Sequence, residues 1–265
     1  MPTRDSQASI ARISLALLER YWPDHPRLNV LRDAAVSGSA SPWLGPICTF
    51  LRGRNEELFL LLLDDYALCD PARTDVIDRA ARMMREDHSV GLFPLCWYPA
   101  ATRTPRAGRP GIVTLGGTPI LLQAAIWRRS WFLQLAEEMD GATSPWSFEA
   151  MATQRAKVHP AQICAAQMPE PRHRGGHLID GLDKSDWPLP YHNLMHRGEP
   201  ELAHEAFLRR EGFAFPARGL GDTVARLAAA TGVAAAVEQI SHATGRDCGC
   251  QRRRGLLNRA VPYHR

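Results

Sequence analysis

A run of six bulky apolar residues at positions 58–63 is followed at once by two aspartates, Asp64 and Asp65. The run is too short to cross a bilayer, and its lack of alternation predicts a strand buried on both faces of a sheet. Open α/β sheets bind ligands beyond the carboxyl ends of their strands, which is where these two acids would stand. Adjacent carboxylates repel each other unless a cation or a donor compensates them, so the pair indicates either a binding site or a solvated loop cap.

Helical and strand patterns alternate over the first hundred residues. Periodic apolar residues predict helices, and short apolar runs predict strands, in the order 10–21 (helix), 28–31 (strand), 42–52 (helix), 58–63 (strand), 71–84 (helix) and 90–97 (strand). This alternation favours a mainly parallel, three-layer α/β domain.

The later segments are less regular. Residues 99–117 contain three prolines, four glycines and the arginines Arg103, Arg106 and Arg109, which predicts a basic loop, either a substrate-facing lid or a surface insertion. Order resumes with an apolar stretch at 120–127, a helix at 146–157 opened by a Ser-Pro pair, and a helix at 199–210.

Charge is distributed unevenly along the 265 residues. The net charge is +4, but from Arg246 onward six arginines stand against one acid, so the remainder of the chain is close to neutral. A basic tail suggests an anionic partner, although solubility alone would also explain it. No apolar stretch approaches about 18 residues and the start lacks a secretory signal, so we expect a cytoplasmic protein with no membrane partner.

These patterns predict two domains, an α/β domain over residues 1–215 and a small helical basic module over 216–265. The module contains two alanine-rich helices interrupted near Thr231 and Gly232, then Cys248 and Cys250, then a basic helix. Two cysteines alone do not complete a tetrahedral zinc site, which would need further ligands such as His242 or His264.

Three segments carry a family resemblance through their order and separation: FLLLLDDY (59–66), QAAIWRR (123–129) and SPWSFE (144–149). Together they resemble glycosyltransferases of the GT-A fold, and look most like a group found in bacterial surface-sugar loci and phage genomes. The likeness covers roughly residues 2–215, and the tail resembles a carboxy-terminal module of phage proteins. It implies a GT-A-like, Rossmann-like three-layer sandwich with a helical appendage.

The resemblance also implies a nucleotide-sugar donor, most simply a UDP-sugar, and a divalent cation, Mn or Mg, that offsets charge on the leaving diphosphate. It assigns metal binding to Asp65 and to the late His196, with His192 as an alternative. The family pattern has one residue between its two acids, so adjacent acids put the metal requirement in question. The implied donor-binding residues are Thr3, Arg4, Asp5, Asp64, Asp65, Trp127 and Arg128.

Two of these donor-site assignments rest on incomplete or ambiguous patterns. Family members begin with a strand that contacts the nucleotide, and residues 1–5 look like only its end, so the strand is missing or the true start lies upstream. Arg128 would bind the diphosphate bidentately, and Trp127 would pack on a sugar or base. Equally, Trp127 and Trp131 share a helix face and would then belong to the core.

Glu149 is the implied catalytic base. It stands one turn into the helix opened by Ser144, beside Trp146 and Phe148, whose rings would desolvate it and raise its basicity. The alternative is that Glu149 only complements the helix dipole.

The basic segments favour a polyanionic acceptor. We therefore expect transfer to a 5-hydroxymethylated pyrimidine, such as 5-hydroxymethylcytosine, in phage DNA. The alternatives are transfer to a surface polysaccharide or virion protein, and a non-catalytic DNA-binding or structural protein on a decayed transferase scaffold. The expected nucleic-acid contacts are Arg103, Arg106, Arg109, Arg252, Arg253 and Arg254.

Overall fold

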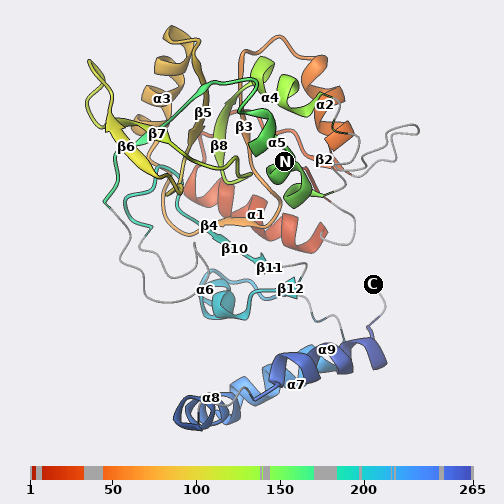
Figure 1. The fold of residues 1–265 in the computed structure, drawn as a ribbon. Helices are drawn as coiled ribbons and strands as arrows, with labels where there is room; N and C mark the ends of the chain where they lie inside the picture. Colours follow the sequence, from red (N-terminus) through yellow and green to blue (C-terminus); the bar gives the residue numbers. More distant parts are fainter. Residues whose placement is uncertain are drawn as a thin grey trace. The chain divides into compact units, whose positions relative to one another are not determined.

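The computed structural model divides the chain into two compact units, unit 1 (Met1–Glu211) and unit 2 (Gly212–Arg265) (Figure 1). The sequence places its domain boundary between residues 215 and 216. The structure describes residues 2–3, 8–32, 44–137, 139, 144–169, 184–196, 199–215, 217, 219–244 and 248–263.

Six strands of unit 1 form a mixed sheet. In spatial order they are β3 (Leu58–Leu61), β8 (Ala125–Arg128), β5 (Val90–Pro94), β9 (Gln162–Ala166), β7 (Ile112–Gly116) and β6 (Thr102–Pro105). Within this sheet β5 and β9 run parallel, and the other neighbouring strands are antiparallel. The α/β class is confirmed, but the expectation of a mainly parallel sheet was wrong.

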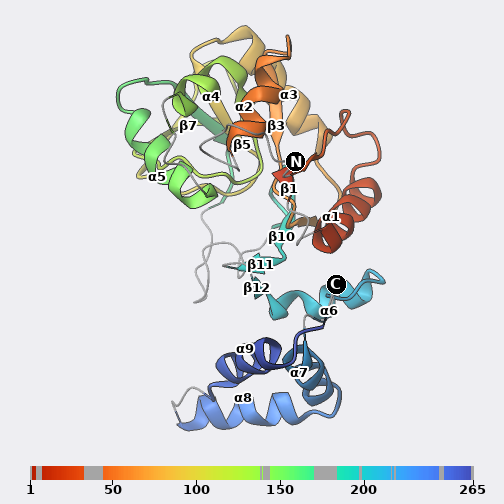
Figure 2. The same ribbon diagram turned by 90° about the vertical axis from the view of Figure 1, so that its right-hand side faces the viewer.

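Helices cover both faces of this sheet, which gives three layers (Figure 2). Helices α1 (Ala8–Tyr21) and α3 (Thr74–Glu86) pack into one apolar cluster. Helices α2 (Leu44–Arg52), α4 (Arg129–Ala136) and α5 (Pro145–Arg155) pack into the other. Alternation along β5 divides its side chains between them, with Phe93 in the first cluster and Leu92 in the second.

Short strands lie outside the main sheet. Strands β1 (Pro2–Thr3) and β2 (Leu31–Arg32), which precede and follow α1 in the sequence, pair in parallel. Strand β4 (Tyr66–Leu68) pairs antiparallel with β10 (Tyr191–Asn193). The end of unit 1 contains β11 (Met195–His196), β12 (Glu199–Pro200), the 3-10 helix η2 (Leu202–His204) and α6 (Glu205–Arg210). The helix expected over 199–210 was therefore wrong in its first half.

Strand β3 is not the doubly buried central strand that the sequence predicts. It lies at one edge of the six-stranded sheet, and its residues 58–60 are only partly buried. It also stops at Leu61, so Leu62 and Leu63 continue as extended chain before the acids. This edge strand is apolar because its side chains contact an apolar cluster on each face of the sheet.

Residues 99–117 form a β-hairpin, which corrects the expectation of a loop. Thr102 pairs with Gly116 and Pro105 with Val113 across β6 and β7. The turn between them contains Gly108 and Gly111, whose φ angles are +69° and +73°. Glycine tolerates these left-handed conformations, so the glycines that appeared to break structure close a hairpin.

Unit 2 consists of α7 (Leu220–Ala230), α8 (Val233–Thr244) and α9 (Cys250–Ala260). The predicted interruption at Thr231 and Gly232 is confirmed, since Gly232 has a φ of +78°. A disulfide joins Cys248 to Cys250, the first residue of α9. Among the described helices, none alone is long and apolar enough to cross a bilayer, whereas α7 and α8 together pass on length and composition with an 87° bend between them.

Candidate active site

Asp64 and Asp65 occupy the corner of a tight turn between β3 and β4. The turn is closed by Tyr66 N–H donating to the Leu63 carbonyl at 3.3 Å. The acids therefore follow the strand by two residues rather than capping it directly. On the far side of the turn, Leu194 N–H donates to the Asp65 carbonyl at 2.8 Å, which fixes the turn against the end of β10.

Asp64 is buried and Asp65 is partly buried. Asp64 is 8% exposed, and the Oδ1 atom of Asp65 is buried with no hydrogen bond from the described residues. Burial, together with the negative charge of Asp64, raises the pKa of Asp65 to about 7. A buried carboxyl oxygen without a donor is costly, so this turn suits a cationic or hydrogen-bonding ligand.

The turn and Glu149 converge on one residue, Leu122. The Tyr66 hydroxyl donates to the Leu122 carbonyl at 2.8 Å, and Leu122 N–H donates to Glu149 Oε1 at 2.6 Å. Leu122 lies in the extended segment that enters β8, whose residue Ala125 pairs with Leu61 at the end of β3. The antiparallel register thus brings Glu149 to the same end of the sheet as Asp64 and Asp65.

Helix α5 holds Glu149 in place. The predicted cap is confirmed: Ser144 accepts from Ser147 N–H, and Pro145 occupies the first turn. Burial raises the pKa of Glu149, and the hydrogen bond from Leu122 offsets part of that rise. Accepting from Leu122 uses one carboxylate oxygen, and the second retains lone pairs that can take a proton. Phe148 is buried and stacks on Phe132, whereas Trp146 is 63% exposed.

Three tyrosines that the sequence assigns no role contact one another or the segment that contains Leu122. Tyr66 stacks on Tyr191 with ring centroids 4.3 Å apart, and the Tyr98 hydroxyl donates to the Leu121 carbonyl at 3.2 Å. Burial raises the pKa of all three phenols, so they remain neutral donors. Tyr66 follows the acids directly in the sequence, and that adjacency is the signal that would have identified it.

Asp64 and Asp65 are the residues of this turn that could hold a divalent cation. Among the described residues no group of three or more histidine, cysteine, aspartate or glutamate side chains is placed to hold a metal. Magnesium, however, is commonly bound through one or two carboxylates plus substrate phosphates, and Asp64 and Asp65 supply such a pair. His192 is engaged elsewhere, because its Nδ1 lies 2.8 Å from Lys184 Nζ and its ring lies 4.2 Å from that of His204.

The structure places Trp127 and Arg128, two of the expected donor-binding residues, in the interior of unit 1. Trp127 is fully buried, stacks on Trp131 and meets Phe132 edge to face, so it belongs to the core. Arg128 pairs with Leu58 at the start of β3, the opposite end of that strand from the acids.

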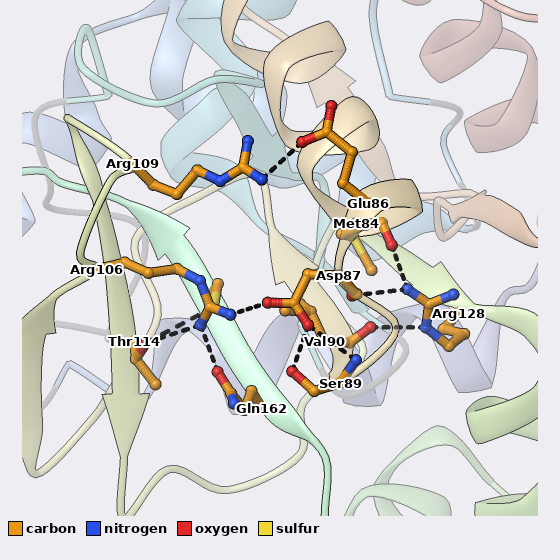
Figure 3. Close-up of polar contacts among 11 residues, drawn as sticks. Met84, Glu86, Asp87, Ser89, Val90, Arg106, Arg109, Thr114, Arg128 and Gln162 are labelled. Atoms are coloured by element: carbon orange, nitrogen blue, oxygen red, sulfur yellow. Dashed lines mark hydrogen bonds and ion pairs between the residues drawn. The ribbon is translucent and has the colours of Figure 1, made fainter.

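Arg128 has a structural role. Its guanidinium donates to the carbonyls of Met84, Asp87 and Val90 (Figure 3). It also pairs with Glu57, so the side chain ties the end of α3 to β5 and β8. The N–H donors of Arg128 are therefore bonded to backbone carbonyls and do not point to a site for a diphosphate.

The three arginines of the β6/β7 hairpin make contacts within the protein. Arg106 pairs with Asp87 and also donates to Gln162, and Arg109 Nη2 lies 2.6 Å from Glu86 Oε2 (Figure 3). Arg103 donates to the Tyr98 carbonyl and lies over the Trp97 ring. Their charges are therefore compensated or packed in this structure.

The arginines of α9 are not equivalent. Arg252 and Arg253 are exposed, and Arg253 donates to the Cys248 carbonyl. Arg254 is 11% exposed and its Nε lies 2.6 Å from Asp222 Oδ1, so it is a structural residue and not a free phosphate contact. Arg4 and Asp5 lie outside the described residues, as do the side chains of Thr3 and His196.

Comparison with known proteins adds little to this geometry. No protein-family model matches the chain, and no curated protein matches it. A solved structure with a related arrangement is apo UDP-glucose pyrophosphorylase, which is 11% identical, covers 63% of this chain and 71% of its own, and superposes with a TM-score of 0.32. A score that low carries no argument about the activity of this chain.

Proposed function

We propose that unit 1 transfers a sugar from a nucleotide-sugar donor, with Asp64 and Asp65 at the donor diphosphate and Glu149 as the base. The observation that carries this proposal is the convergence at Leu122, where the turn bearing Asp64 and Asp65 and the helix bearing the partly buried Glu149 contact one residue. Paired acids at a cation and a separate basic carboxylate are the groups that glycosyl transfer requires.

In the proposed reaction Glu149 takes the proton from an acceptor hydroxyl. The acceptor oxygen then bonds to the anomeric carbon as the bond from that carbon to the diphosphate oxygen breaks. A divalent cation held by Asp64 and Asp65 would neutralise charge on the departing nucleoside diphosphate. The hydrogen bond from Tyr66 keeps the turn beside Leu122. The raised pKa of Asp65 favours a protonated carboxyl near neutral pH, and that proton would be released if a cation bound.

The test is donor turnover measured by mass spectrometry. We expect the chain, given a panel of UDP-sugars and Mn²⁺ or Mg²⁺, to release UDP, and Asp65→Asn to abolish that release. Asp75→Asn is the matched control, because Asp75 is an exposed aspartate on α3. Absence of both UDP release and a thermal shift with UDP and Mn²⁺ would instead favour the decayed, non-catalytic scaffold.

The acceptor stays a prediction. The sequence favours a 5-hydroxymethylated pyrimidine in DNA, but Arg106 and Arg109 are paired with acids, so support for DNA now rests on the exposed Arg252 and Arg253. Offering hydroxymethylcytosine DNA, unmodified DNA and glycans in parallel, then digesting to nucleosides, separates the DNA acceptor from the polysaccharide or virion-protein alternative.

A further inference from the structure

Unit 2 buries polar groups and exposes apolar ones. At the centre of its α7/α9 contact, Asp222 is 1% exposed and accepts from Arg254 Nε and from Asn258 Nδ2, each at 2.6 Å. Leu227, on the same helix as Asp222, is 65% exposed. The hydrophobic effect alone would favour the reverse arrangement, so the apolar side chains of unit 2 require a cover.

The exposed apolar residues follow helical spacing. Val224 and Leu227 are one turn apart on α7, and Val233 and Ile240 are two turns apart on α8. Helix α9 adds Leu256, which is 50% exposed, and Leu257. All three helices of unit 2 therefore present large apolar side chains to solvent.

Positive charge lies beside the exposed apolar residue Leu256 of α9. Residues 212–265 contain eight arginines and three acids, a net charge of +5, whereas the rest of the chain is close to neutral. On α9, the exposed Arg252 and Arg259 lie four residues before and three residues after Leu256, so all three share one face. A partner for this face of α9 must then be both apolar and anionic.

We propose that unit 2 binds the surface of an anionic lipid membrane. Apolar side chains would enter the acyl boundary, and the arginines would lie at the headgroup phosphates, their stems along the apolar surface. Helices α7 and α8 have 11 and 12 residues and are bent by 87° at their junction. At 1.5 Å per residue each is roughly 17 Å long, about half of the hydrocarbon thickness, so they would lie on the bilayer rather than span it.

Two rival occupants fit these observations less well. A second copy of unit 2 would cover exposed apolar residues but would bring together two units that each have a net charge of +5. A nucleic acid would satisfy the arginines, but its phosphate backbone offers nothing to Leu227 or Ile240.

The test is flotation of the full chain with vesicles. We expect binding to an equal mixture of phosphatidylcholine and phosphatidylglycerol, and none to phosphatidylcholine alone. Leu227→Ser/Ile240→Ser and Arg252→Gln/Arg259→Gln should each lower the partition coefficient by about an order of magnitude, and added salt should weaken binding. The matched controls are Val158→Ser and Arg79→Gln/Arg82→Gln, which change exposed residues of unit 1 and should bind as the parent does.

Three outcomes would overturn this proposal. The first is that the chain does not bind anionic vesicles at low salt. The second is that the Leu227→Ser/Ile240→Ser variant, with its helical circular dichroism intact, binds as strongly as the parent. The third is that the chain dimerises or binds DNA instead of binding vesicles. The proposal is independent of sugar transfer: Asp65→Asn should bind vesicles normally, and Leu227→Ser/Ile240→Ser should still turn over donor.

Discussion

Tyr66 and Glu149 bind the two polar backbone groups of one residue, Leu122, although 83 positions separate them in the sequence. This link makes the position of Glu149 depend on the turn that contains Asp64 and Asp65. It also separates a catalytic role for Glu149 from a merely structural one, because a neutral side chain of the same shape can keep the contact with Leu122.

Glu149→Gln should lower donor turnover about 10²–10⁴-fold, the usual effect of removing a general base. Its amide oxygen can still accept from Leu122, so the melting temperature should not fall. Glu56→Gln, at an exposed position, is the control and should keep full activity. Retained activity in Glu149→Gln would leave that glutamate with only a structural role.

The pH dependence should show opposite trends in activity and stability. The pKa of Glu149 is raised above its ordinary 4.5 by burial, so the folded state binds the proton more tightly than the unfolded state. As pH rises from about 4.5 through the folded pKa, activity should increase while the contribution of Glu149 to unfolding free energy decreases. Urea unfolding measured over this pH range should show the decrease in unfolding free energy in the parent. The decrease should be absent from Glu149→Gln.

Asp87 should make the opposite contribution to stability. The hydrogen bond from Ser89 and the pairing with Arg106 lower its pKa below the ordinary 3.8. Its stabilising effect is therefore present above pH 3.8 and is lost as pH falls through the folded pKa. Asp87→Asn should cost about 1–3 kcal/mol at neutral pH, measured by urea unfolding, and should flatten the acid limb of the stability curve. Asp78→Asn, exposed on α3, is the control.

Trp127 should respond to substitution as a core residue. Trp127→Ala should lower the unfolding free energy by about 3–5 kcal/mol, because it empties a site packed by Trp131 and Phe132. Trp127→Phe keeps much of the ring and should leave the KM for the donor unchanged. An increased KM in a stably folded Trp127→Phe would restore the donor-binding assignment.

Local signals in the sequence predict much of the fold. Ser144 with Pro145 identifies the start of α5, and the spacing of Val76, Ile77 and Met83 identifies the buried face of α3, because caps and periodicity depend on near neighbours. Strand direction depends on distant pairing, so nothing in residues 58–63 reveals that β3 is an antiparallel edge strand.

Charged residues were the least predictable part of the site. Arg128 looks like an anion ligand in the sequence, yet carbonyls more than thirty positions away use its donors. The hairpin at 102–116 could have been predicted from the sequence. The apolar run from Ile112 to Leu115 after Gly108 and Gly111 is typical of a strand that follows a turn.

The division of the apolar interior by the sheet has a consequence for combined substitutions. Met83 on α3 and Leu135 on α4 lie in different clusters with a layer of strands between them. Lacking common neighbours, the two positions should behave as thermodynamically independent sites, so a double variant would lose the sum of the two individual losses. Each interior could then be re-engineered without first correcting for the other.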